Sequence, residues 1–235
     1  NNMANVNTNG YKKDTVVFES FPSVLTKRIK DFEKTSNRPS NIGTMELSHD
    51  IGEVYTYFSQ GQLTNTGNEL DMAISDSNNA FFTVAAVDDE GNYTEFYTRD
   101  GSFTRGADGS LRTKEGYYVL GENGPIVLGS GDFTVKEDGT VIQNGQIVDR
   151  LLITEFTDTM HLRKYGYNLL VSGGDAETRE FSGTVRQGYT ELSNVNIIRE
   201  MVDMITVTRS YEANQKVLQA IDDTLEKAVN QVGAL

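Results

Sequence analysis

The most regular hydrophobic pattern in the chain lies in residues 188–235. From Tyr189 onward there is no proline and one glycine, Gly233. Apolar residues recur at steps of three and four, which predicts one long helix of about 40 residues, ~60 Å in length, with a narrow apolar stripe of the coiled-coil type. Ser193 is the predicted N-cap. The apolar positions are Val195, Ile198, Val202 and Ile205, followed by Met204, Val207, Tyr211, Leu218, Ile221, Leu225, Ala228 and Val232.

A narrow apolar stripe on a long helix needs a partner, because an isolated helix is only marginally stable in water. No other segment of the sequence predicts a comparable helix. We consider two interpretations. In the first, the stripe binds another copy or another protein. In the second, the helix folds back on the rest of the chain as ordinary α+β packing.

Residues 68–187 read as a series of short strands separated by turns. The turns are predicted at Asp100-Gly101, Asp108-Gly109, Asp138-Gly139 and Asn144-Gly145, among others. Glycine and asparagine supply the positive φ that tight hairpins need, and regular turn spacing indicates an antiparallel barrel or sandwich. The Asp-Gly pairs lack the alternating acidic residues of a calcium loop, so we interpret them as turns.

Residues 1–67 form an N-terminal segment that begins with the asparagine-rich stretch "NNMANVNTNG" and contains a predicted strand at residues 54–58. The predicted fold is therefore mainly β with a long terminal α segment. It has three parts: an N-terminal segment 1–67, a central antiparallel β domain 68–187 that is barrel- or sandwich-like, and a C-terminal coiled-coil-type helix in 188–235.

The amino-acid composition excludes several classes of function. The 235 residues include no cysteine, so disulfides and thiolate chemistry are excluded, and the net charge of −13 disfavours nucleic acid as a partner. No apolar run is long enough to span a bilayer, and no signal peptide is visible. His49 and His161 lack the neighbours of a metal site or proton relay, and Ser102 lies in a predicted hairpin without a paired histidine. We therefore expect no enzyme activity, catalytic residue, metal or cofactor.

The ends of the chain carry a resemblance to a known family. "NNMANVNTNGYKKD" and "LSNVNIIREMVDMITVTRSYEANQKVLQAIDDTLEKA" are similar to the two terminal signatures of the bacterial flagellar basal-body rod and hook (axial) proteins. In the middle, "TGNELDMAI", "YTRDGSFTRGADGSLRTKEGYYVLG" and "LRKYGYNLL" resemble the family's central β domain. The chain departs from the family in lacking about twenty helical residues before the asparagine-rich stretch and in having "AISDSNNAFFTV" where a glycine-rich stretch is usual.

The resemblance implies a structural subunit of the rod, of the distal- or proximal-rod type, that polymerises into a helical tube and transmits torque from motor to hook. Its partners would be copies of itself, adjoining rod and hook proteins and bushing-ring proteins, without direct membrane insertion. It would act in the basal body after export without a cleaved signal peptide. The terminal segments would pair as helices. Without the N-terminal helix we expect the C-terminal helix to be frayed, mispaired or bound to a neighbour.

Twelve residues are the candidate subunit interface. For Asn194 and Asn196 the alternative is helix capping, for Arg209 and Glu212 a mutual surface pair, and for Met201 and Met204 the protein core. Asn214, on the stripe, is interpreted as a residue that fixes register. The full set is Asn5, Asn7, Gly10, Asn194, Asn196, Glu200, Met201, Met204, Arg209, Tyr211, Glu212 and Asn214.

Two other function classes remain as alternatives. An adhesin or binding module would hold a partner with the loops of its β domain and use the helix as a stalk. A hydrolase would need paired carboxylates across a cleft, whereas most acidic residues here lie in predicted turns or on the helix.

Overall fold

The computed structural model describes residues 1–20, 24–28, 40–45, 49–87, 92–166, 168–174 and 176–232. The chain forms two compact units. One contains residues 1–11 and 59–235, and the other contains residues 12–58. The three-part division made from composition follows chain order and stays a prediction.

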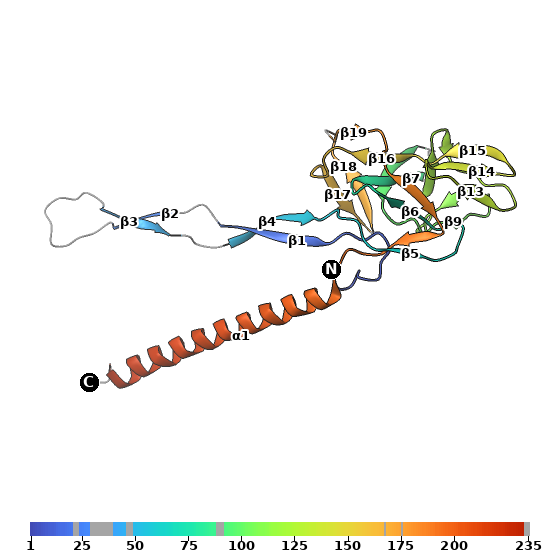
Figure 1. The fold of residues 1–235 in the computed structure, drawn as a ribbon. Helices are drawn as coiled ribbons and strands as arrows, with labels where there is room; N and C mark the ends of the chain where they lie inside the picture. The colour runs from blue at the N-terminus through green and yellow to red at the C-terminus, as the bar shows by residue number, and fades with distance from the viewer. Residues whose placement is uncertain are drawn as a thin grey trace. The chain divides into compact units, whose positions relative to one another are not determined.

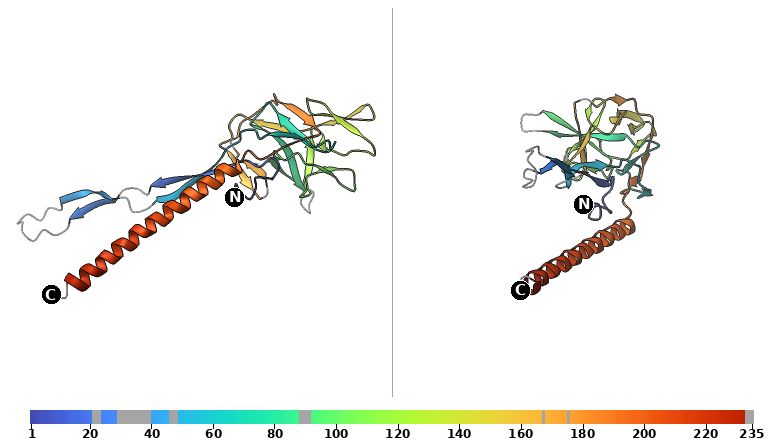
Figure 2. Two further views of the ribbon diagram at one scale, coloured as in Figure 1. Left: turned by 60° about the horizontal axis from the view of Figure 1, so that its bottom comes forward. Right: turned by 90° about the vertical axis from the view of Figure 1, so that its left-hand side faces the viewer.

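The described residues of the unit 12–58 include two pairs of antiparallel strands (Figures 1 and 2). Strand β1 (Asp14–Ser20) pairs antiparallel with β4 (His49–Thr56), with Val16 opposite Val54. Strand β2 (Val24–Arg28) pairs in the same way with β3 (Ser40–Met45). The strand predicted at residues 54–58 is confirmed as far as Thr56, where β4 ends.

The larger unit is built around a ten-stranded antiparallel sheet with the main order β17-β18-β8-β7-β11-β10-β9. Strand β7 (Ala80–Val87) is central and pairs with β8, β11 and β16. The other strands are β8 (Tyr93–Thr98), β9 (Thr104–Arg105), β10 (Leu111–Arg112), β11 (Tyr118–Gly121), β12 (Gly124–Pro125), β16 (Ile153–Phe156), β17 (Leu162–Tyr165), β18 (Leu169–Ser172) and β19 (Thr178–Arg179).

Three smaller antiparallel sheets complete this unit. They are β13-β14-β15, β20-β6 and β21-β5. The last pair joins the segment before the helix to the segment that leads into the β domain. The bounds are β5 (Leu63–Asn65), β6 (Met72–Ser75), β13 (Phe133–Val135), β14 (Thr140–Gln143), β15 (Gln146–Arg150), β20 (Thr184–Gln187) and β21 (Tyr189–Glu191).

The sheets do not close into a barrel, so this part of the fold prediction was wrong. In the described residues the main path of the large sheet ends at β17 on one side and β9 on the other, and these two strands do not pair. Several strands have only two to four residues, which leaves too little ladder to carry the sheet around to closure. Regular turn spacing predicts antiparallel strands but does not determine whether a sheet closes.

The hairpin turns predicted at Asp108-Gly109, Asp138-Gly139 and Asn144-Gly145 are confirmed, because each connects two paired strands and its glycine has positive φ. The hairpin predicted at Asp100-Gly101 was wrong, because that turn connects β8 and β9, which do not pair with each other. Asn144 and Gly145, between β14 and β15, both have positive φ, at 53° and 76°. Positive φ at both central residues is the requirement of a type I′ hairpin turn, which Asn-Gly meets at low cost. The sequence signal therefore reflects a backbone constraint that acts locally.

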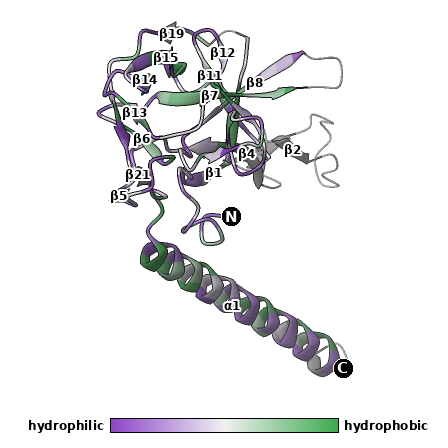
Figure 3. Ribbon diagram, turned by 90° about the vertical axis from the view of Figure 1, so that its right-hand side faces the viewer, coloured by the Kyte–Doolittle hydropathy of each residue, from purple (hydrophilic) through white to green (hydrophobic). Residues whose placement is uncertain are grey.

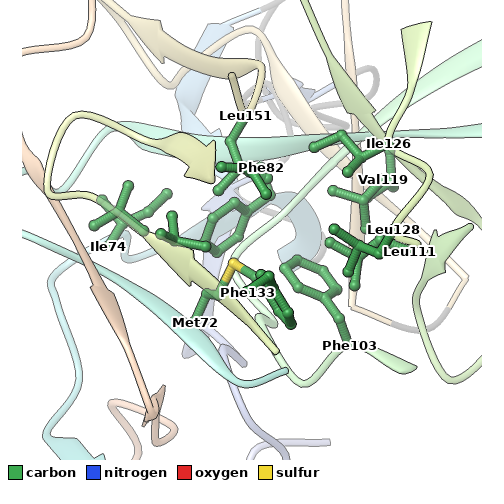
Figure 4. Packing of buried hydrophobic residues seen from close by; sticks show 14 of the residues in the cluster. Met72, Ile74, Phe82, Phe103, Leu111, Val119, Ile126, Leu128, Phe133 and Leu151 are labelled. Atoms are coloured by element: carbon green, nitrogen blue, oxygen red, sulfur yellow. The ribbon is translucent and has the colours of Figure 1, made fainter. Parts of the chain in front are cut away.

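The core lies inside the β domain and is formed by side chains from many strands (Figure 4). Phe82 and Phe103 meet edge to face, with ring centroids 5.2 Å apart. Strand β7 is buried along most of its length, and so it shows a continuous apolar run where a half-exposed strand would alternate. Met72, Leu111 and Ile126 pack in the same cluster.

The C-terminal segment forms helix α1 (Ile197–Lys227, 31 residues), followed by a π-helical turn η1 (Ala228–Val232). The helix is shorter than predicted because it begins at Ile197, and residues 189–191 form β21, which pairs with β5. Its N-cap is Asn196, so the prediction of Ser193 was wrong. The Asn196 Oδ1 accepts hydrogen bonds from the Ile198 and Arg199 amides, both at 3.1 Å. The described helix contains no stretch apolar enough to cross a membrane.

No residue of α1 is buried. The interpretation that the helix packs its apolar stripe on the β domain is therefore wrong. The described part of the chain supplies no second helix for the stripe, and its coiled-coil character stays a prediction.

Candidate assembly surface

The two asparagine-rich ends of the chain meet in the larger unit, and we call this region the terminal junction (residues 9–11, 59–62 and 191–196). The Gly10 amide donates to the Glu191 carbonyl at 2.7 Å, and the Asn194 amide donates to the Tyr11 carbonyl at 3.4 Å. The Leu192 amide donates to the Gln62 carbonyl at 2.9 Å. The end of the asparagine-rich N-terminal stretch and the segment before the helix are therefore parts of one local structure.

Residues 1–10 fold as consecutive turns. The Asn5 amide donates to the Asn1 carbonyl at 3.2 Å, and the Asn5 Nδ2 donates to the same oxygen at 3.0 Å. The Thr8 amide donates to the Asn5 carbonyl at 3.1 Å. Asn5 thus shapes the turn itself, whereas Asn7 is exposed.

Position 10 requires glycine because of its backbone conformation and because there is no room for a side chain. Its φ is +68°, and a Cβ at this position would lie 2.4 Å from the Asp100 nitrogen and 2.5 Å from the Arg99 carbonyl carbon. Any side chain would collide with backbone atoms, which cannot swing away as a side chain can. The N-terminal segment therefore lies directly on the turn that follows β8.

The segment before α1 is held by hydrogen bonds to residues from distant parts of the sequence. The Asn194 Nδ2 donates to the Ser59 carbonyl at 3.1 Å and to the Ser59 Oγ at 3.0 Å. The Asn2 Nδ2 donates to the Glu200 Oε2 in the first turn of α1 at 3.1 Å. The alternatives for Asn194 and Asn196 were helix capping and a subunit contact. Capping is confirmed for Asn196, while the Asn194 side chain forms hydrogen bonds with Ser59 of the same chain.

Beneath the terminal junction lies an ion pair between Arg99 and Glu191, whose side chains are 1% and 0% exposed. The Arg99 Nε donates to the Glu191 Oε2 at 2.6 Å. The remaining guanidinium nitrogens donate to carbonyl oxygens: Nη1 to Ala80, and Nη2 to Ser77 at 2.6 Å and Ile74 at 3.3 Å. Because each charged group has its partners, the cost of burying the pair is largely offset.

A second buried carboxylate, Glu155, lies in the same unit. Burial on its own would raise the pKa of Glu155, but hydrogen bonds from Ser182, Arg179 and Ser77 outweigh it and hold the pKa below its ordinary value. The Ser77 Oγ donates at 2.8 Å and the Ser182 amide at 2.9 Å. In contrast, burial raises the pKa of Asp100 above its ordinary value.

Helix α1 presents many large apolar side chains to solvent, and Figure 3 shows hydrophobic positions recurring along its length between hydrophilic ones. Tyr211 is 64% exposed and Leu218 is 62% exposed. Met201 and Met204 are exposed as well, so their assignment to the core of this chain was wrong. Arg209, Glu212 and Asn214 are also exposed on the helix.

The paired strands β1 and β4 present a second exposed apolar surface. Val16, Val54 and Tyr55 are 42%, 55% and 44% exposed, and Tyr55 and Tyr57 meet edge to face at 5.0 Å. A two-stranded ribbon is at best marginally stable by itself in water. Exposed β-branched and aromatic side chains on such a ribbon are typical of a surface that another chain covers.

The described residues contain no group of histidine, aspartate and glutamate side chains arranged to hold a metal ion. His161 is exposed, and the side chain of His49 lies outside the described part of the structure. Ser102 is buried in its turn, where its Oγ accepts a hydrogen bond from the Asn9 Nδ2 at 2.7 Å. Ser102 therefore supports the N-terminal segment.

The sequence analysis missed the Arg99–Glu191 pair. The available signal was that each charged residue stands directly beside a strand: Arg99 follows β8 and Glu191 ends β21. A charged residue at a strand end is usually solvated, so this pattern alone does not indicate burial. The two residues are 92 positions apart, and only the fold brings them together.

Comparison with known proteins gives consistent matches. Residues 186–232 match a family model described as flagellar basal body rod FlgEFG protein C-terminal, and residues 77–147 match one described as flagellar hook protein FlgE/F/G D1 domain. The first match covers α1, and the second covers most of the strands around β7. The two matches therefore fall on both parts of the larger unit.

Individual proteins match along nearly the whole chain. The chain is 33% identical to the flagellar basal-body rod protein FlgG of Buchnera aphidicola subsp. Acyrthosiphon pisum, over 97% of this chain and 90% of that protein. It is 29% identical to the flagellar hook-basal body complex protein FlhO of Bacillus subtilis, over 100% and 92%. It is 31% identical to the flagellar basal-body rod protein FlgF of Caulobacter vibrioides, over 100% and 90%.

Proposed function

Because this chain belongs to the flagellar basal-body rod and hook protein family, we propose that it is a structural subunit of the rod, which polymerises into a tube and transmits torque from motor to hook. The observation that carries the proposal is helix α1, whose apolar positions recur along 31 residues without a buried side chain. Burying such positions against neighbouring subunits is the driving force that an assembling protein needs.

The proposed interface lies along α1. Met201, Met204 and Tyr211 are the apolar contacts, Arg209 and Glu212 form polar contacts with a neighbour, and Asn214 fixes the register between helices. Asn7 is an additional contact because its side chain is exposed. Asn5, Gly10, Asn194, Asn196 and Glu200 serve the interface indirectly by building the turns and the start of the helix.

The exposed apolar side chains of β1 and β4 form a second contact surface in this proposal. Because subunits in an open helical array contact each other through different faces, one surface on a helix and another on a ribbon suit continued addition of copies. Partners are then copies of this chain, adjoining rod and hook proteins, and bushing-ring proteins around the rod. The relatives are named as rod or hook-basal body proteins, which favours this function over an adhesin or a hydrolase.

The proposed site of action is the basal body in the cell envelope, which the subunit reaches by export without a cleaved signal peptide. A chain without cysteine has no disulfide to form or reduce on either side of a membrane. An exposed helix held at one end by a few hydrogen bonds also has little tertiary structure to lose if the chain is exported unfolded.

The test is deletion of the gene followed by complementation with the wild-type chain or with Tyr211→Asp and Leu218→Asp variants. We expect deletion to remove flagellar filaments and to leave basal bodies with an incomplete rod in electron micrographs. The wild-type chain should restore filaments, and the aspartate variants should fail because they place a charge on the apolar stripe. Lys216→Asp, a change at another position on the same helix, is the control for added charge.

Normal filaments in the deletion strain would contradict the proposed function. Full complementation by both aspartate variants, at the level of the wild-type chain, would contradict the proposed role of α1. Circular dichroism of the purified variants should show unchanged strand content, since no residue of α1 is buried in the β domain.

A further inference from the structure

The buried pair of Arg99 and Glu191 lies where three distant stretches of the chain converge. Gly10 donates its amide to the Glu191 carbonyl at 2.7 Å and lies against the Arg99 backbone. Gly61 donates its amide to the Glu191 Oε1 at 2.7 Å. A Cβ at Gly61 would lie 1.9 Å from the Leu192 carbonyl oxygen, so this approach is also as close as glycine allows.

The partners of Arg99 come from the β domain. Its Nη atoms donate to the carbonyl oxygens of Ile74, Ser77 and Ala80, which lie at the end of β6, in the following turn and at the start of β7. Glu191 is the last residue of β21, five positions before the N-cap of α1. One ion pair therefore links the β domain to the residues that set the start of the helix.

Stability alone does not account for this arrangement. Buried ion pairs are often no more stabilising than apolar residues of the same volume, because removing two charges from water offsets their attraction. The contribution of the pair is a defined geometry. A planar guanidinium holds several carbonyl oxygens and one carboxylate in fixed positions, which an apolar side chain or a lysine does not.

We infer that Arg99 and Glu191 are positioning residues that fix the terminal junction on the β domain, so that the N-terminal segment and the start of α1 are held in one register. The inference extends the proposed function, since a rod subunit has to present α1 from a defined point for copies to add in a regular array. Both side chains of the pair are buried inside the larger unit. The pair acts through Gly10, Gly61 and the segment of residues 191–196.

Conformational variation at the terminal junction would impair regular assembly. Neighbouring copies of a helical array repeat the same contact geometry, so variation at the start of α1 would recur in each subunit. The hydrogen bonds of Asn2, Asn194 and Asn196 define where the helix starts only if β21, the strand that precedes the helix, is itself held in place. The Glu191 side chain fixes that strand.

The test is amide hydrogen exchange, measured by NMR on the full chain, for wild type and Arg99→Lys. The lysine keeps the buried charge but has one nitrogen in place of the planar fork. We expect the Gly10 and Leu192 amides of the terminal junction to exchange at least about tenfold faster, since they depend on local order. The core amides of Leu111 and Ile126, which donate to the Ile126 and Val119 carbonyls, should keep their protection.

Arg179→Lys is the matched control, because Arg179 pairs with the other buried carboxylate, Glu155, at 2.5 Å. It should leave the Gly10 and Leu192 amides unchanged. A second variant, Arg99→Met with Glu191→Gln, removes both charges and keeps an acceptor for the Gly61 amide. It should show the same selective loss at the terminal junction without leaving an unpaired charge in the core.

Equal acceleration of terminal-junction and core amides in both Arg99 variants would overturn the inference, because the pair would then serve general stability. Unchanged Gly10 and Leu192 amides in both variants would overturn it too. The exchange result does not depend on the rod assignment. In the deletion strain, folded Arg99→Lys protein should restore swimming poorly while the wild-type chain restores it. Normal swimming of the deletion strain would contradict the proposed function alone and would leave the exchange result unaffected.

Discussion

At the scale of single residues, the least replaceable positions are those where backbone approaches backbone. Gly10 combines a positive φ with a contact that leaves no room for a Cβ. Gly67 has the same φ of +68° but nothing within 4 Å of its Cβ position. Substitution of Gly67 therefore tests the free-energy cost of the backbone conformation alone, and substitution of Gly10 tests that cost together with the steric collision.

We predict that Gly10→Ala destabilises the larger unit more than Gly67→Ala does. Gly67→Ala should cost about 1–2 kcal/mol, the usual penalty for a side chain at this φ. Gly10→Ala should cost more, because it also displaces the segment from the Asp100 turn. Urea unfolding followed by circular dichroism measures both, and equal midpoints for the two variants would show that the close contact relaxes without cost.

At the scale of elements, α1 is the part of the molecule whose stability is most local. Its residues are exposed, so hydrogen bonds within the helix and at its cap replace tertiary packing as the source of order. The Asn196 Oδ1 accepts hydrogen bonds from two amides of the first turn that have no acceptor within the helix. Glu200 adds a negative charge near the positive end of the helix dipole.

We predict that Asn196→Ala reduces the helix content of the purified chain and leaves the unfolding of the β domain unchanged. Loss of an N-cap costs about 0.5–2 kcal/mol of helix stability. Asn214→Ala is the control, since it replaces an exposed asparagine within the helix by a better helix former and should raise helix content. Far-UV circular dichroism measures both. No difference between the variants would mean that the cap does not limit the helix.

At the scale of the whole molecule, acidic residues dominate the charge, and the net charge is −13. Hydrogen bonds from Ser110 and Arg112 lower the pKa of Asp108 to about 2. The pKa of Asp138, which accepts from the Thr140 amide, is also lowered, as is that of Glu155. A carboxyl group whose pKa is lowered by folding stabilises the folded state above its unfolded pKa, and this contribution is lost as the pH falls.

We predict that the free energy of unfolding begins to fall as the pH drops below the ordinary glutamate pKa of 4.5, and that Glu155→Gln weakens this dependence. The variant should be less stable than wild type at pH 7 and closer to it at pH 3. Asp100 opposes the trend, because its pKa is raised by burial. Urea unfolding at both pH values measures the effect, and parallel curves for wild type and variant would contradict the role of Glu155.

The sequence by itself determined the features that depend on neighbours along the chain. The three- and four-residue spacing predicts α1, and Asn144-Gly145 predicts its hairpin, because helix periodicity and positive φ are local properties. The resemblance of both terminal segments to axial proteins predicts the family that the comparisons confirm. Strands were predicted in the right region for the same local reasons.

Only the tertiary structure decided which distant residues meet. The sheet stays open because its end strands β17 and β9 do not pair, a property of the whole arrangement of strands. Residues 189–191 pair as β21 with β5, more than 120 positions away in the sequence, and α1 begins only at Ile197, after its N-cap Asn196. Arg99 and Glu191 are unremarkable in the sequence. They become a buried pair only because folding excludes water around them and supplies every polar atom with a partner.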